Sequence, residues 1–213
     1  MPDVGGLDFE YLGADVDRAA ASPTVLLRLR ITESSGNPVH AIALRTQVRV
    51  EPHRRRYDDD EAAALVDLFG SRDRWGQTLK PLQLAFVSHL VPSFSGSTET
   101  SLALPCSYDF DVAANKYLYS LVEGVAPLLL LFSGTWFSGT AGALTVLPIS
   151  WDKEVTAGLP VETWRAAMDQ HFPGTAWLRL GRDTFDALYR YRAENAMVSW
   201  DEAVTRLLKE AGE

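Results

Sequence analysis

The stretch TVLLRLRITESSGNPVHAIALRTQVRVE, residues 24–51, decides the fold class of this chain. In residues 24–32, aliphatic side chains alternate with polar ones, a period of two that is typical of a half-buried strand. The alternation returns over residues 39–51, after the turn-forming residues 34–38. We therefore predict a β-hairpin with one apolar face and one face that carries arginines.

Further strands are predicted on both sides of this hairpin, each bounded by glycine, proline, serine or asparagine. Their ranges are Leu7–Leu12, Leu82–Val91, Thr98–Leu104, Cys106–Val112, Lys116–Val122, Ala126–Phe132 and Ala143–Trp151. One inserted helix is predicted over Glu61–Phe69, with Asp60 as its N-cap residue. This spacing favours an antiparallel β-sandwich or strongly bent sheet, and a single large antiparallel sheet with helices on one face is the alternative.

The pattern changes after Trp151, where apolar residues begin to recur at helical spacing. The predicted elements are helices Pro160–Phe172 and Asp183–Asn195, a short strand Ala176–Leu180, and a last helix that begins at a capping box of Ser199 and Glu202. Strands that precede helices indicate an α+β fold. We expect a β-rich domain over residues 1–151 and a helical C-terminal subdomain, residues 152–213, packed on it.

The composition of the chain argues against some kinds of partner and some cellular locations. The 213 residues carry a formal net charge of −8, and an acidic chain repels phosphate backbones, so we expect no nucleic-acid partner. The apolar run Val125–Phe132 is too short to span a bilayer, and the first residues lack the basic and apolar regions of a signal peptide. We therefore expect a cytoplasmic protein without a membrane span.

Motifs for common chemistry are missing from the sequence. The four histidines show no metal-binding spacing, and Cys106 has no second cysteine as a companion. Cys106 stands in an apolar context without a nearby base, which favours an inert buried thiol. No nucleophile elbow or phosphate-binding loop occurs. We accordingly expect no enzyme activity, no metal and no cofactor.

Cationic and aromatic residues form the candidate binding site. They are Arg28, Arg30, Arg45, Arg49, Arg54, Arg55, Arg56, Tyr57 and Trp75. The first four would share the outer face of the predicted hairpin, and the others follow in a long charged connection, so the group could dock an acidic partner or an anion. The more ordinary interpretation is a solvated face whose arginines pair with the carboxylates of residues 58–61.

Two other functions stay open on the sequence. A small-molecule or metal-dependent enzyme would use Asp109 and Asp111, with His89, in an acidic cleft. A structural subunit of a homo-oligomer would pair an exposed sheet edge between copies.

Several motifs, taken together, resemble a known family. They are GNPVHAI (36–42), EPHRRRY (51–57), DLFG (67–70) with RWG (74–76), LFSGT (131–135), Trp151-Asp152 and Ser199-Trp200-Asp201. The chain resembles, over nearly its whole length, an uncharacterised actinobacterial domain-of-unknown-function family whose members look to be encoded beside nickel–iron hydrogenase genes. The resemblance implies a non-enzymatic accessory or scaffold role in hydrogenase maturation or assembly, with a hydrogenase component as protein partner. It assigns no catalytic residue.

Overall fold

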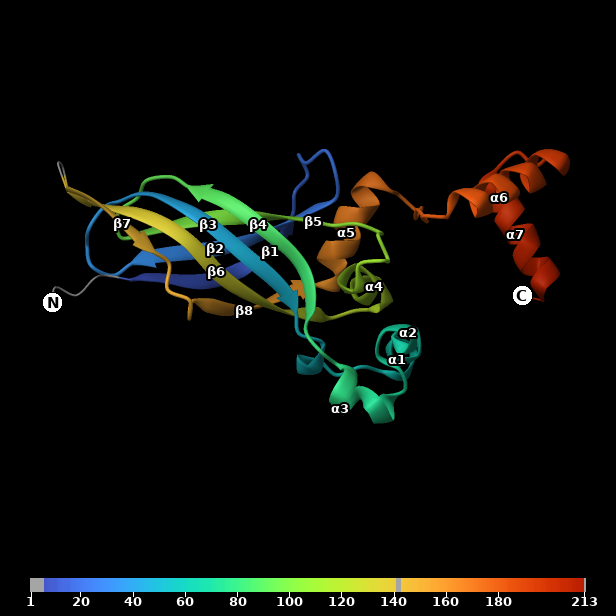
Figure 1. Cartoon of the computed structure of the whole chain (residues 1–213), viewed down its shortest axis with the longest axis horizontal. Helices are drawn as coiled ribbons and strands as arrows, with labels where there is room; N and C mark the ends of the chain where they lie inside the picture. The colour runs from blue at the N-terminus through green and yellow to red at the C-terminus, as the bar shows by residue number, and fades with distance from the viewer. Residues whose placement is uncertain (1–5, 141–142, 213) are drawn as a thin grey trace. The chain divides into compact units, whose positions relative to one another are not determined.

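The structure, a computed structural model, describes residues 6–140 and 143–212. In this part of the chain, eight strands form two antiparallel sheets (Figure 1). The first sheet has the order β1–β2–β5 and contains β1 (Leu7–Val16), β2 (Thr24–Glu33) and β5 (Ser97–Pro105). The second has the order β4–β3–β6–β7, with β8 also paired to β6, and contains β3 (Val39–Val50), β4 (Leu82–Val91), β6 (Val125–Thr140), β7 (Ala143–Pro148) and β8 (Glu154–Pro160). The predicted α+β class is confirmed.

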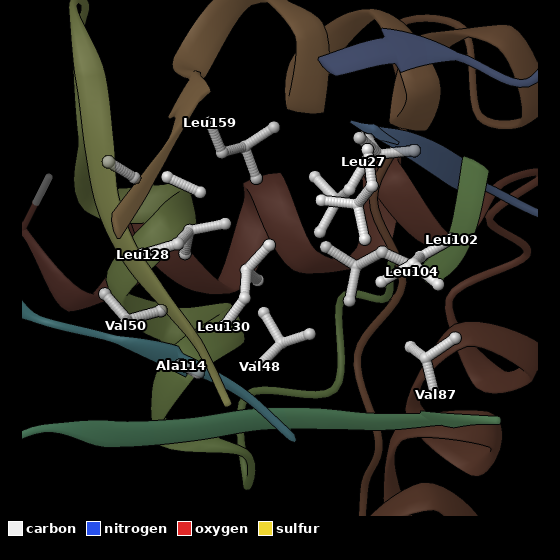
Figure 2. Close-up of a cluster of buried hydrophobic side chains, with 14 of the residues drawn as sticks. Leu27, Val48, Val50, Val87, Leu102, Leu104, Ala114, Leu128, Leu130 and Leu159 are labelled. Atoms are coloured by element: carbon white, nitrogen blue, oxygen red, sulfur yellow. The ribbon is translucent and has the colours of Figure 1, made fainter. Parts of the chain in front are cut away.

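One apolar core lies between the two sheets. Figure 2 shows Leu27, Leu102 and Leu104 of the first sheet close to Val48 and other aliphatic side chains of the second. All four are fully buried, and they occupy alternate positions of their strands, as the period of two predicts. Each sheet therefore turns its aliphatic face inward and its polar face outward.

The predicted β-hairpin over residues 24–51 is wrong. β2 pairs with β1 and β5, whereas β3 pairs with β4 and β6, so the two strands belong to different sheets. The turn between them is held by the buried carboxylate of Glu33, which accepts hydrogen bonds from the amides of Ser35 and Gly36 at 2.8 Å each. The alternation of apolar and polar residues shows which face of a strand is buried. It does not show whether the next strand is hydrogen-bonded beside it or packs across the core from it.

Helices α4 (Ala113–Ser120) and α5 (Val161–His171) close one end of the sandwich (Figure 1). Tyr117 and Trp164 are buried there, in the same core as the strands. The strands predicted over residues 106–112 and 116–122 are therefore wrong. The buried residues Ala114, Tyr117, Leu118 and Leu121 follow a helical period, which indicates a helix rather than a strand.

The inserted helical segment follows β3. It begins with a 3₁₀ turn, Pro52–Arg54, and continues with α1 (Asp59–Ala64), α2 (Val66–Phe69), a second 3₁₀ turn (Arg72–Arg74) and α3 (Trp75–Thr78). The single predicted helix is thus two short ones that meet at Leu65, which is fully buried. The N-cap residue is Asp58 rather than Asp60, since its carboxylate accepts from the Glu61 amide at 2.8 Å.

The chain divides between Ala176 and Trp177 into two compact units. The sequence places its boundary after residue 151, but β8 pairs with β6 and α5 packs into the core, so both belong to the first unit. Val155, Ala157 and Leu159 do alternate in β8. The glycine and proline of this short strand obscured the signal.

The second unit, called the C-terminal hairpin below, covers residues 177–212. It contains α6 (Arg182–Glu194) and α7 (Trp200–Ala211), which pack on each other. No strand forms over residues 176–180. The predicted cap of α7 is confirmed: the Ser199 hydroxyl accepts from the Glu202 amide at 3.0 Å, while the Glu202 carboxylate accepts from the Val198 amide at 3.0 Å.

Candidate functional site

The four strand arginines of the predicted site lie on two different surfaces. Arg28 and Arg30 belong to β2 in the first sheet, whereas Arg45 and Arg49 belong to β3 in the second. The inner faces of the two sheets meet in the core, so their outward side chains point away from each other. The arginine face predicted from the sequence is therefore not formed as one surface.

In the first sheet, the arginines pair with carboxylates of neighbouring strands. Arg28 Nε lies 2.8 Å from Asp15 of β1. Arg30 bridges Glu10 of β1 and Glu99 of β5, at 2.8 Å each. These carboxylates raise the pKa of Arg30, mainly through the hydrogen bond that Arg30 donates to Glu99. The pairing resembles the ordinary interpretation of a solvated face, but the partners are not residues 58–61.

In the second sheet, Arg49 forms an ion pair with a buried carboxylate. Glu51 follows β3 and is almost wholly buried. Arg49 Nη2 donates to its Oε1 at 3.0 Å, and His53 Nδ1 lies 3.5 Å from its Oε2. The Glu51 amide also donates to the Pro127 carbonyl of β6 at 2.9 Å. These contacts hold the C-terminal end of β3 against β6.

Arg55 forms an ion pair with Glu61, the first-turn carboxylate of α1. Arg55 Nη2 lies 2.5 Å from Glu61 Oε1, and the exposed fractions of the two side chains are only 13% and 2%. The same Oε1 accepts from the Val122 amide at 2.9 Å, while Arg55 Nη1 donates to the Val125 carbonyl at 3.1 Å. The pair therefore ties the inserted segment to the start of β6.

Tyr57 and Trp75 also hold the inserted segment in place. The Tyr57 hydroxyl donates to the Pro52 carbonyl at 2.7 Å and lies 2.8 Å from the Tyr117 hydroxyl of α4. Burial raises the pKa of Tyr57 to about 12. Trp75 meets the Tyr57 ring edge-on at a centroid distance of 5.2 Å, and its Nε1 donates to the Gly70 carbonyl at 3.0 Å. These contacts are structural.

Three arginines of the predicted site have no carboxylate partner in the part of the chain that the structure describes. They are Arg45, Arg54 and Arg56. Arg45 lies over the Phe86 ring, 4.8 Å from its centroid, and Arg54 Nη1 donates to the Thr156 hydroxyl at 3.0 Å. These three are what remains of the predicted cationic surface.

The residues of the proposed acidic cleft are engaged in separate local structures. His89 Nε2 lies 2.6 Å from the Thr100 hydroxyl, joining β4 to β5. Asp109 lies in the loop before α4, where its side chain accepts from the Asp111 amide at 3.2 Å and its carbonyl from Asn115 at 3.3 Å. Among residues 6–140 and 143–212, no three histidine, cysteine or acidic side chains are grouped so that they could hold a metal ion.

Cys106 lies at the end of the core. Its thiol donates to the Leu104 carbonyl at 3.7 Å, and burial raises its pKa to about 12. A thiol with that pKa is not a nucleophile at neutral pH.

An open hollow of about 380 Å³ lies beside α4. Its apolar lining includes Phe110, Tyr119, Leu121 and Val122, and Lys116 and Arg165 add positive charge. A strand over Lys116–Val122, as predicted from the sequence, would not form this hollow. The helical period of these residues was the available signal.

The C-terminal hairpin exposes much of its apolar surface. In this unit only Met197 and Ala203 are buried hydrophobic residues. Ten large apolar side chains are exposed: Trp177, Leu178, Leu180, Phe185, Tyr189, Val198, Trp200, Val204, Leu207 and Leu208. Phe185, Tyr189 and Trp200 form a cluster with centroid distances of 5.6–6.4 Å, and Arg192 lies 4.1 Å from the Trp200 ring centroid.

None of the described helices has both the length and the apolar character needed to cross a bilayer.

Comparisons with known proteins identify the family of the chain but no function. Residues 4–213 match the sequence profile of a family of unknown function, which confirms that part of the resemblance. No curated protein matches the chain.

Two solved structures show a weak likeness. One is a Bordetella pertussis protein provisionally named ApaA, with 11% identity, a TM-score of 0.26, and coverage of 71% of this chain and 92% of the other. The second is β-glucosidase 3B from Thermotoga neapolitana, solved with α-D-glucose, with 13% identity, a TM-score of 0.25, and coverage of 71% and 17%. At such TM-scores neither carries an argument about this chain.

Proposed function

The chain belongs to DUF6084, a family of unknown function, and we propose that it is a non-enzymatic accessory protein that binds another protein through its C-terminal hairpin. The observation that carries the proposal is the exposed apolar surface of this hairpin. Monomeric proteins seldom leave a contiguous apolar surface of that kind without a partner. A unit of about 40 residues or fewer also has too little core to be stable alone.

The occupant we propose is an amphipathic helix of the partner protein. α7 has an apolar stripe of Val204, Leu207 and Leu208, all partly exposed, and it packs on α6. A helix laid along this stripe would complete a three-helix arrangement, a common mode of peptide recognition.

Charge supports an apolar mode of binding. Residues 177–212 carry six arginines and lysines against six aspartates and glutamates, so the hairpin is neutral in a chain of net charge −8. The affinity must therefore come from apolar burial rather than from a net attraction between charges. Arg45, Arg54 and Arg56, for which the described residues supply no carboxylate partner, would increase the rate of encounter rather than the affinity.

We propose a nickel–iron hydrogenase component as the partner, and a role for this chain in hydrogenase maturation or assembly. The support for this partner is the family resemblance of the sequence. The test is affinity capture from the native cell with the full chain as bait, followed by titration of the identified protein in pure form. Leu207→Glu combined with Leu208→Glu is expected to weaken that binding at least about a hundredfold, since charges replace two leucines that the partner would bury.

Two controls make the test specific. Leu90→Glu introduces the same charge at a leucine of β4 that is 68% exposed, outside the hairpin, and should leave binding unchanged. Arg54→Ser with Arg56→Ser should weaken binding only a few fold. Equal binding by the Leu207/Leu208 variant, with its helix content intact by circular dichroism, would refute the proposal. Light scattering that shows a dimer disrupted by the same variant would assign the surface to a second copy instead.

A further inference from the structure

The hollow beside α4 combines apolar and aromatic side chains with two cations. Its floor includes Leu121, which is fully buried, while Tyr119 and Val122 are half exposed around it. Its volume of about 380 Å³ is that of a small-molecule site, since ligand pockets measure roughly 300–1,000 Å³. An apolar recess of this size is filled more favourably by an apolar group than by water.

Aromatic rings form one wall of the hollow. Phe110 and Tyr119 lie at a centroid distance of 5.0 Å, and both contact Tyr108, at 6.1 and 6.0 Å. Tyr108 in turn meets the buried Trp164 ring edge-on at 6.0 Å. The wall is thus backed by packed rings that hold Phe110 and Tyr119 in position. Such a wall suits a flat, aromatic ligand.

A guanidinium group stands at the rim. Arg165 Nη2 donates to the Leu121 carbonyl at 2.6 Å, which orients the side chain toward the hollow's edge. In the described residues no carboxylate pairs with Arg165, whereas the other cation of the lining, Lys116, already pairs with Asp67. A guanidinium has five N–H donors, so most of those of Arg165 stay available for an anion. Arg165 therefore offers charged N–H donors to an anion at the edge of an apolar hollow.

From the apolar floor, the aromatic wall and the oriented Arg165, we infer that the hollow binds a small aromatic carboxylate. The ring of the ligand lies against Phe110 and Tyr119, and its carboxylate accepts hydrogen bonds from the guanidinium. All residues that line the hollow belong to the first unit, and none belongs to the C-terminal hairpin, so the inference does not depend on the proposed function.

The experiment uses the full chain and a matched pair of probes, 1-naphthaleneacetate and the neutral 1-naphthaleneethanol, with binding followed by calorimetry. The acid is expected to bind at least about tenfold more tightly than the alcohol, because a hydrogen-bonded ion pair adds to the same apolar contact. Arg165→Gln should abolish that difference. Arg45→Gln, which removes an exposed charge from the outer face of β3, should preserve it.

A second pair of variants tests the location. Val122→Glu places a negative charge at the hollow and should weaken binding of the acid at least about tenfold. Val66→Glu alters a valine of α2 that is 52% exposed and does not line the hollow, so it should have no effect. Equal affinity for the acid and the alcohol, no binding of either, or equal losses in Val122→Glu and Val66→Glu would each overturn the inference. A variant that fails to fold is replaced by Tyr119→Ala, for which the same loss is expected.

Discussion

Removal of the Glu61 carboxylate tests whether the ion pair with Arg55 holds the inserted segment. In Glu61→Ala, Arg55 loses its carboxylate partner and the Val122 amide loses its acceptor, while the backbone of α1 and its cap at Asp58 are unchanged. The guanidinium then remains in a site where only 13% of the side chain is exposed.

The magnitude follows from that burial. Breaking a buried pair by removing one partner costs about 3–5 kcal/mol, because an uncompensated charge stays behind. The small exposed fraction of Arg55 lets some water reach it, so we expect a loss of about 3 kcal/mol in the free energy of unfolding. For a chain of this length each kcal/mol lowers Tm by about 2–4 °C, so Tm should fall by about 6–12 °C.

The assay is urea unfolding at pH 7 with m-values compared, alongside calorimetry. The matched control is Asp15→Ala, which breaks the exposed pair with Arg28, whose side chains are 49% and 58% exposed, and should cost no more than about 1 kcal/mol. Arg55→Met combined with Glu61→Leu should cost less than Glu61→Ala alone, since no lone charge remains. If Glu61→Ala costs no more than Asp15→Ala, the pair does not hold the segment and the reasoning fails.

Three further predictions concern single residues. Gly134→Ala should cost about 3 kcal/mol or more in chemical unfolding, because the residue has φ +129° and its Cβ would lie 2.1 Å from the Ala43 carbonyl oxygen; an unchanged midpoint would contradict this. Cys106, with its pKa raised to about 12, should resist iodoacetamide at pH 8 in the folded protein and react once the protein is unfolded in urea, so rapid alkylation of the native chain would be the opposite result. Tyr57 keeps its proton to about pH 12 in the folded state but loses it near pH 10 when unfolded, so stability should fall between pH 10 and 12. Tyr57→Phe should reduce that fall in unfolding curves measured across the range, while Tyr11 and Tyr117, whose pKa values burial also raises, maintain part of it.

The sequence identified the residues of the candidate site but did not show which residues they contact. It identified Arg55, Tyr57 and Trp75 as a distinctive connection, and all three do cooperate, but as internal supports of the inserted segment. Their partners Glu61 and Tyr117 come from helices, and Tyr117 is distant in sequence. Contacts between residues that are tens of positions apart leave no periodic pattern in the sequence. The local sequence therefore does not show whether a side chain supports the fold or binds a partner.

What the sequence determined by itself was the inward and outward faces of the elements and their local ends. The alternation in β2 and β3, the helical spacing of α5 and the cap at Ser199 are each set by a few adjacent residues, because burial and capping act over one or two turns. What only the tertiary structure decided was which strand lies beside which. The separation of β2 from β3 into two sheets sent their arginines to opposite surfaces. That choice depends on how the whole chain packs around one core, where contacts between distant segments outweigh local preference.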